Sequence, residues 1–229
     1  MMQQARRACG GVRRLAGFAL VAGALLATGG CSIVGAVAEN YRKDATRKVE
    51  AETDVLAGKT FALLVSAPRS VQGDFPALVE TLAARSTERL ANPANVPAAG
   101  GFVPPADVLR YMYSTPAWTL RSKTELGKAL GDVDRLVLIE VSEYRLHAPG
   151  NPYVWDGVAS ALVSVYDPRS RTPEIALFER TVLVKFPDKQ GDGPEQMSAA
   201  LVNSALLARL VDRATWLFYD HQEPYYPTY

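Results

Sequence analysis

Cysteine and histidine, which often supply nucleophiles, metal ligands and proton transfer, are nearly missing from this sequence. Its 229 residues contain two cysteines, Cys9 and Cys31, and two histidines, His147 and His221. We expect the segment that holds Cys9 to be removed, which leaves no second thiol for a disulfide, a CxxC redox pair or a cysteine-based zinc site. Metalloprotease, nucleophile-elbow, phosphate-loop and dinucleotide motifs are also missing. The sequence therefore predicts a protein that is not an enzyme and binds no metal or cofactor.

Residues 1–30 have the layout of an export signal. Four arginines and no acidic residue precede the uncharged stretch LAGFALVAGALLA, and small residues follow it. This apolar run is shorter than the roughly 20 residues that a membrane-spanning helix needs. The pattern is typical of a cleaved signal peptide, and a retained N-terminal anchor helix is the alternative.

Cys31 lies where a lipid anchor would be attached. Ala27-Thr28-Gly29 fits ordinary signal-peptidase cleavage, whereas Gly29-Gly30-Cys31 resembles the bacterial lipobox, with Thr28 in place of the usual leucine. Ordinary cleavage would leave Cys31 as a lone thiol in an oxidising compartment. We therefore predict that Cys31 is lipidated and becomes the mature N-terminus; a free or buried thiol is the alternative.

The mature chain carries no excess of positive charge. Removing residues 1–30 takes four of the 25 lysines and arginines and none of the 24 acids, which leaves 21 against 24 and a net charge near −3. This balance predicts no nonspecific nucleic-acid binding. Residues 31–58 are predicted to be the lipidated N-terminus and a polar tether or loosely held helix, with basic residues near 42–48 solvated rather than bound to a membrane.

Residues 59–221 are predicted to form one domain of α+β class with an α/β-like start. The pattern indicates a mixed sheet that includes an antiparallel three-stranded meander, with helices packed on it and a long C-terminal helix. Ser122 and Glu125 form an S-x-x-E capping box before one helix. The expected strands are 60–68, 101–103, 135–147, 155–167 and 174–186, and the expected helices are about 74–90, 105–113, 123–130 and 195–219.

Aromatic residues are the best candidates for partner contact. Tyr153 and Trp155 lie in the loop HAPGNPYVWDG, and a tyrosine-rich tail at 222–229 carries Tyr225, Tyr226 and Tyr229. Tyrosine and tryptophan offer a large contact area at low entropic cost. Ordinary packing is the alternative for Trp155, and a flexible or folded-back end is the alternative for the tail.

Other polar candidates are weaker. His147 and His221 are predicted to be surface or turn residues. Glu140 and Glu143 are predicted to point to opposite faces of one strand and so not to form a catalytic carboxylate pair.

The lipobox-like start, the polar tether and the order of strands and helices over about 59–219 resemble a broad group of envelope lipoproteins. The group includes curli-secretion channel lipoproteins, lipoprotein activators of penicillin-binding proteins, and proteins resembling the N-terminal domain of the Tol-Pal β-propeller protein. The resemblance implies no shared catalytic centre, and it implies protein partners or assembly into rings.

Three functional hypotheses follow. The first is a noncatalytic, lipid-anchored protein that faces the periplasm, reaches the membrane through its N-terminal lipid, and binds an envelope protein or associates with itself. The residue after the cysteine, Ser32, is not aspartate, which favours the outer membrane. The second is a ring-forming subunit of an export apparatus. The third is an unrecognised hydrolase or carbohydrate-binding module, which a cleft joining carboxylates or aromatics would favour.

Overall fold

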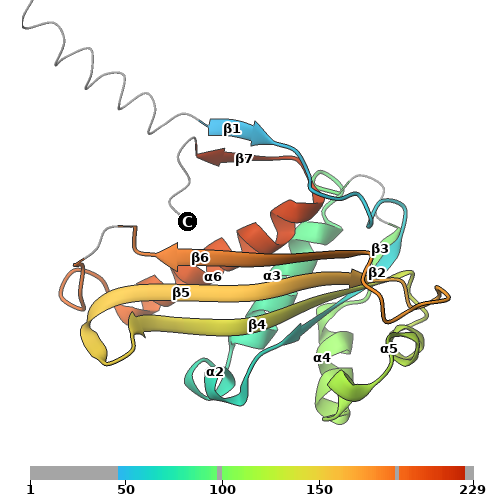
Figure 1. Ribbon diagram of the computed structural model, residues 1–229, viewed down its shortest axis with the longest axis horizontal. Coiled ribbons are helices and arrows are strands. Elements are labelled where there is room, and N and C mark those ends of the chain that lie inside the picture. The colour runs from blue at the N-terminus through green and yellow to red at the C-terminus, as the bar shows by residue number, and fades with distance from the viewer. Residues whose placement is uncertain (1–45, 97–99, 189–190, 225–229) are drawn as a thin grey trace, which may run out of the picture. The chain divides into compact units, whose positions relative to one another are not determined.

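A computed structural model describes residues 46–96, 100–188 and 191–224. The main sheet has the strand order β3-β2-β4-β5-β6, and Figure 1 shows the long β4–β5 hairpin. β3 and β4 run parallel to β2, while β4, β5 and β6 are successively antiparallel. The predicted mixed sheet with its meander is confirmed. The strands are β2 (Thr60–Ser66), β3 (Gly101–Phe102), β4 (Arg135–Ala148), β5 (Asn151–Tyr166) and β6 (Phe178–Phe186).

The four predicted helices are present in the predicted order with shifted boundaries, and two short helical elements, at 69–74 and 118–120, were not predicted. The capping box is present, since the Ser122 side chain accepts from the Glu125 amide and Glu125 accepts from the Ser122 amide. The C-terminal helix begins four residues later than predicted, after the cap Ser198, whose hydroxyl accepts from the Leu201 amide. The helices are α2 (Arg69–Asp74), α3 (Leu78–Ala91), α4 (Pro105–Ser114), η1 (Trp118–Leu120), α5 (Lys123–Ala129), α6 (Ala199–Thr215) and η2 (Trp216–Phe218).

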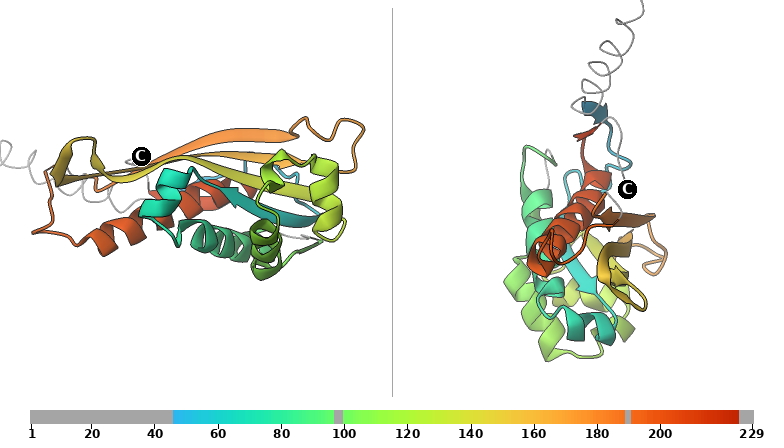
Figure 2. Two further views of the ribbon diagram at one scale, coloured as in Figure 1. Left: turned by 90° about the horizontal axis from the view of Figure 1, so that it is seen from below. Right: turned by 90° about the vertical axis from the view of Figure 1, so that its left-hand side faces the viewer.

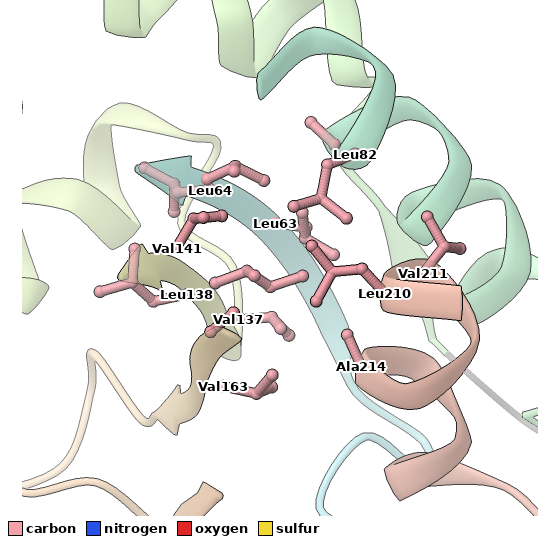
Figure 3. Packing of buried hydrophobic residues seen from close by; sticks show 14 of the residues in the cluster. Leu63, Leu64, Leu82, Val137, Leu138, Val141, Val163, Leu210, Val211 and Ala214 are labelled. Atoms are coloured by element: carbon pink, nitrogen blue, oxygen red, sulfur yellow. The ribbon is translucent and has the colours of Figure 1, made fainter. Parts of the chain in front are cut away.

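The core lies between the sheet and the helices α3 and α6, which cover the same face (Figure 2). β2 is buried along almost its whole length, as its continuous apolar run predicts. Figure 3 shows side chains of the sheet meeting those of the two helices, including Leu63, Val137 and Val163 opposite Leu82, Leu210 and Ala214. Within the described part of the chain, no helix is long and apolar enough to cross a membrane.

A β-bulge in β4 changes one prediction. The register shifts between Val141 and Glu143, so that Glu140 lies opposite Leu162 and Glu143 lies opposite Ser160. Leu162 and Ser160 are two residues apart on β5 and therefore share a face. Directly paired residues lie on the same face of a sheet, so Glu140 and Glu143 do too. The prediction that they point to opposite faces is wrong, because the extra residue of the bulge restarts the alternation.

Strand β1 (Thr46–Val49) lies where the sequence predicted a tether or a loosely held helix. It pairs with β7 (His221–Pro224) in a separate two-stranded sheet. Residues 48–222 form one compact unit. Residues 46–47 of β1 and residues 223–224 of β7 belong to a second unit. In the larger unit, the amides of Glu52 and Thr53 donate to the Leu217 carbonyl, and Leu56 is only 1% exposed. Residues 48–56 are therefore built into the domain.

Candidate functional site

The tip of the β4–β5 hairpin presents one exposed aromatic side chain. Tyr153 is 80% exposed, and the neighbouring residues Asn151 and Pro152 are exposed too. The tip turns at Gly150, which has a positive φ of 79°. The Tyr153 amide donates to the Asn151 side chain over 3.2 Å. The predicted contact residue Tyr153 therefore lies on the surface with its backbone fixed by a local hydrogen bond.

Arg145 braces the two arms of the hairpin. Its guanidinium donates to the Glu143 carboxylate over 2.7 Å and to the Asp156 carboxylate over 2.9 Å. It also donates to the carbonyls of His147 and Asp156. One side chain thus ties both strands together, and charge-assisted hydrogen bonds of this kind are stronger than neutral ones.

Trp155 packs inside the domain instead of facing a partner. It is 4% exposed, and its ring stacks on His147 with centroids 4.3 Å apart. Its indole nitrogen donates to the Met197 carbonyl over 3.0 Å. The assignment of Trp155 to partner contact therefore does not fit its burial. His147 is half-buried, and its Nδ1 lies 3.0 Å from the Val154 carbonyl oxygen, so its ring contacts both strands of the hairpin near the turn.

The loop before α6 supports the same hairpin. The Trp155 amide donates to the Asp192 carbonyl over 2.8 Å. A Cβ at Gly193 would lie 2.6 Å from the Tyr153 carbonyl oxygen, so only glycine allows this close approach. A hollow of about 550 Å³ beside the tip is lined in part by Asn151, Trp155 and Gly191.

A second candidate site is a cleft of about 730 Å³ between the C-terminal part of α3 and the segment that follows α6. Arg85, Glu88 and Arg89 recur at helical spacing on α3 and line one wall. Trp216, Tyr219, Asp220, His221 and Gln222 line the other wall, and Asn92, Asn95, Ala208 and Val211 complete the lining. Sequence reasoning missed this cleft. The recurrence of charge at 85, 88 and 89 was the only local signal, since the two walls are far apart in the chain.

An ion pair joins the two helices at the cleft. Arg89 lies 2.6 Å from the Asp212 carboxylate, and the two side chains are 40% and 25% exposed. Burial raises the pKa of Asp212, and the positive charge of Arg89 opposes this shift. The Asn95 side chain donates to the Arg89 carbonyl over 3.0 Å, which fixes the loop after α3 against the helix.

Aromatic stacking orders the opposite wall. The rings of Trp216 and His221 are nearly parallel, with centroids 4.4 Å apart and an interplanar angle of 8°. The Arg213 guanidinium lies 5.6 Å from the Trp216 ring centroid. His221 is half-buried in this stack rather than a free turn residue. The aromatic groups of this wall are therefore held in place by internal contacts.

Cys31, Tyr225, Tyr226 and Tyr229 lie outside the described residues. Among the residues that the structure describes, no group of three or more histidine, cysteine, aspartate or glutamate side chains is arranged to hold a metal ion.

No protein-family model matches the sequence, and no curated protein matches it. Solved structures with a similar arrangement include lipoprotein GNA1162 from Neisseria meningitidis, at 16% identity and a TM-score of 0.41, covering 66% of this chain and 94% of that one. The PelC dodecamer from Paraburkholderia phytofirmans matches at 12% identity and 0.40, covering 76% and 97%. Protein XCC0632 from Xanthomonas campestris, of the family DUF330, matches at 12% identity and 0.36, covering 74% and 85%. The resemblance to curli-secretion and penicillin-binding-protein-activator lipoproteins is not confirmed.

Proposed function

We propose that this protein is a noncatalytic lipoprotein of the bacterial envelope that binds a protein partner through the tip of its β4–β5 hairpin. Lipid on Cys31 anchors it, and the domain faces the periplasm, at the outer membrane. The anchor rests on the basic n-region, the apolar run and the cysteine behind Gly29-Gly30.

The observation that carries partner binding is the braced presentation of Tyr153. An exposed tyrosine gains most in an interface when little conformational freedom is lost on binding. Here Arg145, the His147–Trp155 stack and the bond from Trp155 to Met197 already order the backbone around it. The arginine, carboxylates and histidine of the hairpin already contact one another or neighbouring groups of the domain. This supports a binding role for the hairpin over a catalytic one.

Site-specific photocrosslinking in the living bacterium tests the partner site. A benzophenone amino acid replaces Tyr153 in one strain and Tyr113 in a control strain, since Tyr113 on α4 is also exposed, at 62%. We expect a crosslinked species of defined mass from position 153 and none from position 113. A ladder of this protein alone would identify self-association. Equal crosslinking at both positions would contradict the hairpin as the contact site.

A Cys31→Ala variant tests the anchor separately. We expect it to lose the acyl mass from its N-terminus and to leave the membrane fraction. A membrane-bound variant whose N-terminal mass equals that of the wild type would show that Cys31 is not the lipid attachment site.

A further inference from the structure

We propose that the cleft between α3 and the segment after α6 is a saccharide-binding site, formed by Arg85, Glu88, Asn92, Trp216 and His221. Its volume of about 730 Å³ lies within the range of ordinary small-molecule sites, roughly 300–1,000 Å³. Neither Cys31 nor Tyr153 takes part, so this site is independent of the anchor and of the hairpin.

The charges that line the cleft cancel. The positive charges of Arg85 and Arg89 balance the negative charges of Glu88 and Asp220. Arg89 is already paired with Asp212, and Asp220 lies 2.7 Å from the Lys48 ammonium and accepts from the Ala51 amide. A phosphate or other anion would meet the carboxylates of the same walls. The balance therefore favours a ligand without net charge.

The polar side chains of the cleft that remain available to a ligand are planar groups that donate or accept hydrogen bonds. In the described part of the chain, the side chains of Arg85 and Glu88 have no hydrogen-bond or ion-pair partner, and both are exposed at the cleft. Asn92 uses its side-chain oxygen in a local bond to the Ala94 amide, which leaves its NH₂ group as a donor. A guanidinium and a carboxylate each bind two neighbouring groups at once. Adjacent hydroxyls of a sugar ring match this arrangement, because each hydroxyl both donates and accepts.

The cleft also has an apolar surface for the C–H face of a sugar. The partly exposed Ala208 lines the cleft above the buried Val211, and the stacked rings of Trp216 and His221 line it too. The stack and the Arg89–Asp212 pair fix these walls before any ligand arrives. A preformed site has a smaller entropic cost of binding.

Titration of the full chain in detergent with neutral oligosaccharides tests the proposal. The probes are chitotetraose, maltotetraose and mannotetraose, followed by calorimetry and by tryptophan fluorescence. We expect saturable binding of at least one probe, with an affinity that changes less than about twofold between about 50 and 500 mM salt, because no charged ligand group is involved.

Three variants locate the binding. Arg85→Ala and Glu88→Gln should each weaken it by roughly fivefold or more, the effect of losing one or two hydrogen bonds. Arg69→Ala is the matched control, since Arg69 is an exposed arginine on α2, and it should leave affinity unchanged. Circular dichroism checks that each variant is folded. The proposal is overturned if none of the probes binds, if Arg85→Ala and Glu88→Gln bind as tightly as the wild type, or if inorganic phosphate displaces the sugar.

Discussion

The guanidinium of Arg89 lies 2.6 Å from the carboxylate of Asp212, so an ion pair joins the last turn of α3 to α6. Asp212 is 25% exposed at its side chain. Removing the cation leaves an unpaired charge in a partly buried position, which destabilises the folded state because burial has removed part of the solvation of the carboxylate. The pair therefore matters more for stability than an exposed ion pair of similar length.

Arg89→Met should lower the free energy of unfolding by about 1–3 kcal/mol at pH 7. Without Arg89, the raised pKa of Asp212 should rise further. The native state then binds a proton that the unfolded chain releases, so stability falls as the pH rises above 3.8, the usual pKa of an aspartate. Urea unfolding should show a larger deficit at pH 7 than at pH 4.

Arg85→Met provides the control for this substitution. Arg85 lies on the same helix, is exposed, and has no partner among the described residues. Its replacement should change the free energy of unfolding by less than about 0.5 kcal/mol. A deficit for Arg89→Met that is equal at both pH values would show that the lost stability comes from packing and not from the charge on Asp212.

Leu56→Ala tests whether residues 48–56 belong to the folded domain. Leu56 is 1% exposed, although the sequence predicted a tether there. Removing a buried leucine side chain leaves a cavity, and we expect a loss of about 2–4 kcal/mol in the free energy of unfolding. Thermal melting of the full chain measures it. Lys48→Ala, at an exposed position in the same segment, should leave the melting temperature nearly unchanged. Equal melting temperatures for the two variants would show that residues 48–56 are a tether outside the folded domain, as the sequence predicted.

Local signals in the sequence predicted the elements well. The capping box of Ser122 and Glu125 formed as expected, because its two hydrogen bonds join residues three positions apart. The buried strand β2 and the meander of β4, β5 and β6 also followed from hydrophobic periodicity and short connections. The prediction succeeded where the determining contacts are close in the chain or repeat along one element.

Features that depend on distant parts of the chain were not predictable. The alternating sequence of β4 does not indicate the bulge after Val141, because the register of the strand is set by its partner β5. β1 pairs with β7, which lies far away in the sequence, and its polar side chains show no strand pattern of their own. The cleft brings together Arg85 and Trp216, which are 131 positions apart in the sequence. Such juxtapositions come from tertiary packing, which a single sequence does not specify locally.

Asp134→Asn should reduce stability in a pH-dependent way. The carboxylate of Asp134 accepts from the amide and the hydroxyl of Thr60, over 3.0 and 2.9 Å. These bonds hold the pKa of Asp134 below its usual value. Its stabilising effect is therefore present above the unfolded pKa of 3.8 and is lost as the pH falls through the lower folded value. The difference from the wild type in urea unfolding should be largest near pH 7 and should shrink below about pH 4.

Asp74→Asn serves as the comparison, because Asp74 is exposed at the end of α2 and accepts no hydrogen bond of this kind in the described structure. It should not reproduce the pH profile of Asp134→Asn. A constant difference for Asp134→Asn from pH 7 to pH 3 would show that shape, and not the charge of the carboxylate, explains the loss.

Gly157→Ala should strain the pairing of β5 with β6. A Cβ at position 157 would lie 2.5 Å from the backbone oxygen of Phe186, and 3.4 Å from a Leu206 methyl on α6. The backbone oxygen cannot rotate away as a side chain could, so we expect a loss of about 1–3 kcal/mol in the free energy of unfolding. Gly73→Ala is the matched control. Nothing lies within 4 Å of its added Cβ, and alanine in a helix should be neutral or stabilising by about 0.5–1 kcal/mol. Hydrogen exchange should show faster opening of β6 in the Gly157 variant alone. Equal protection of β6 in both variants would mean that the two strands separate slightly without weakening the sheet.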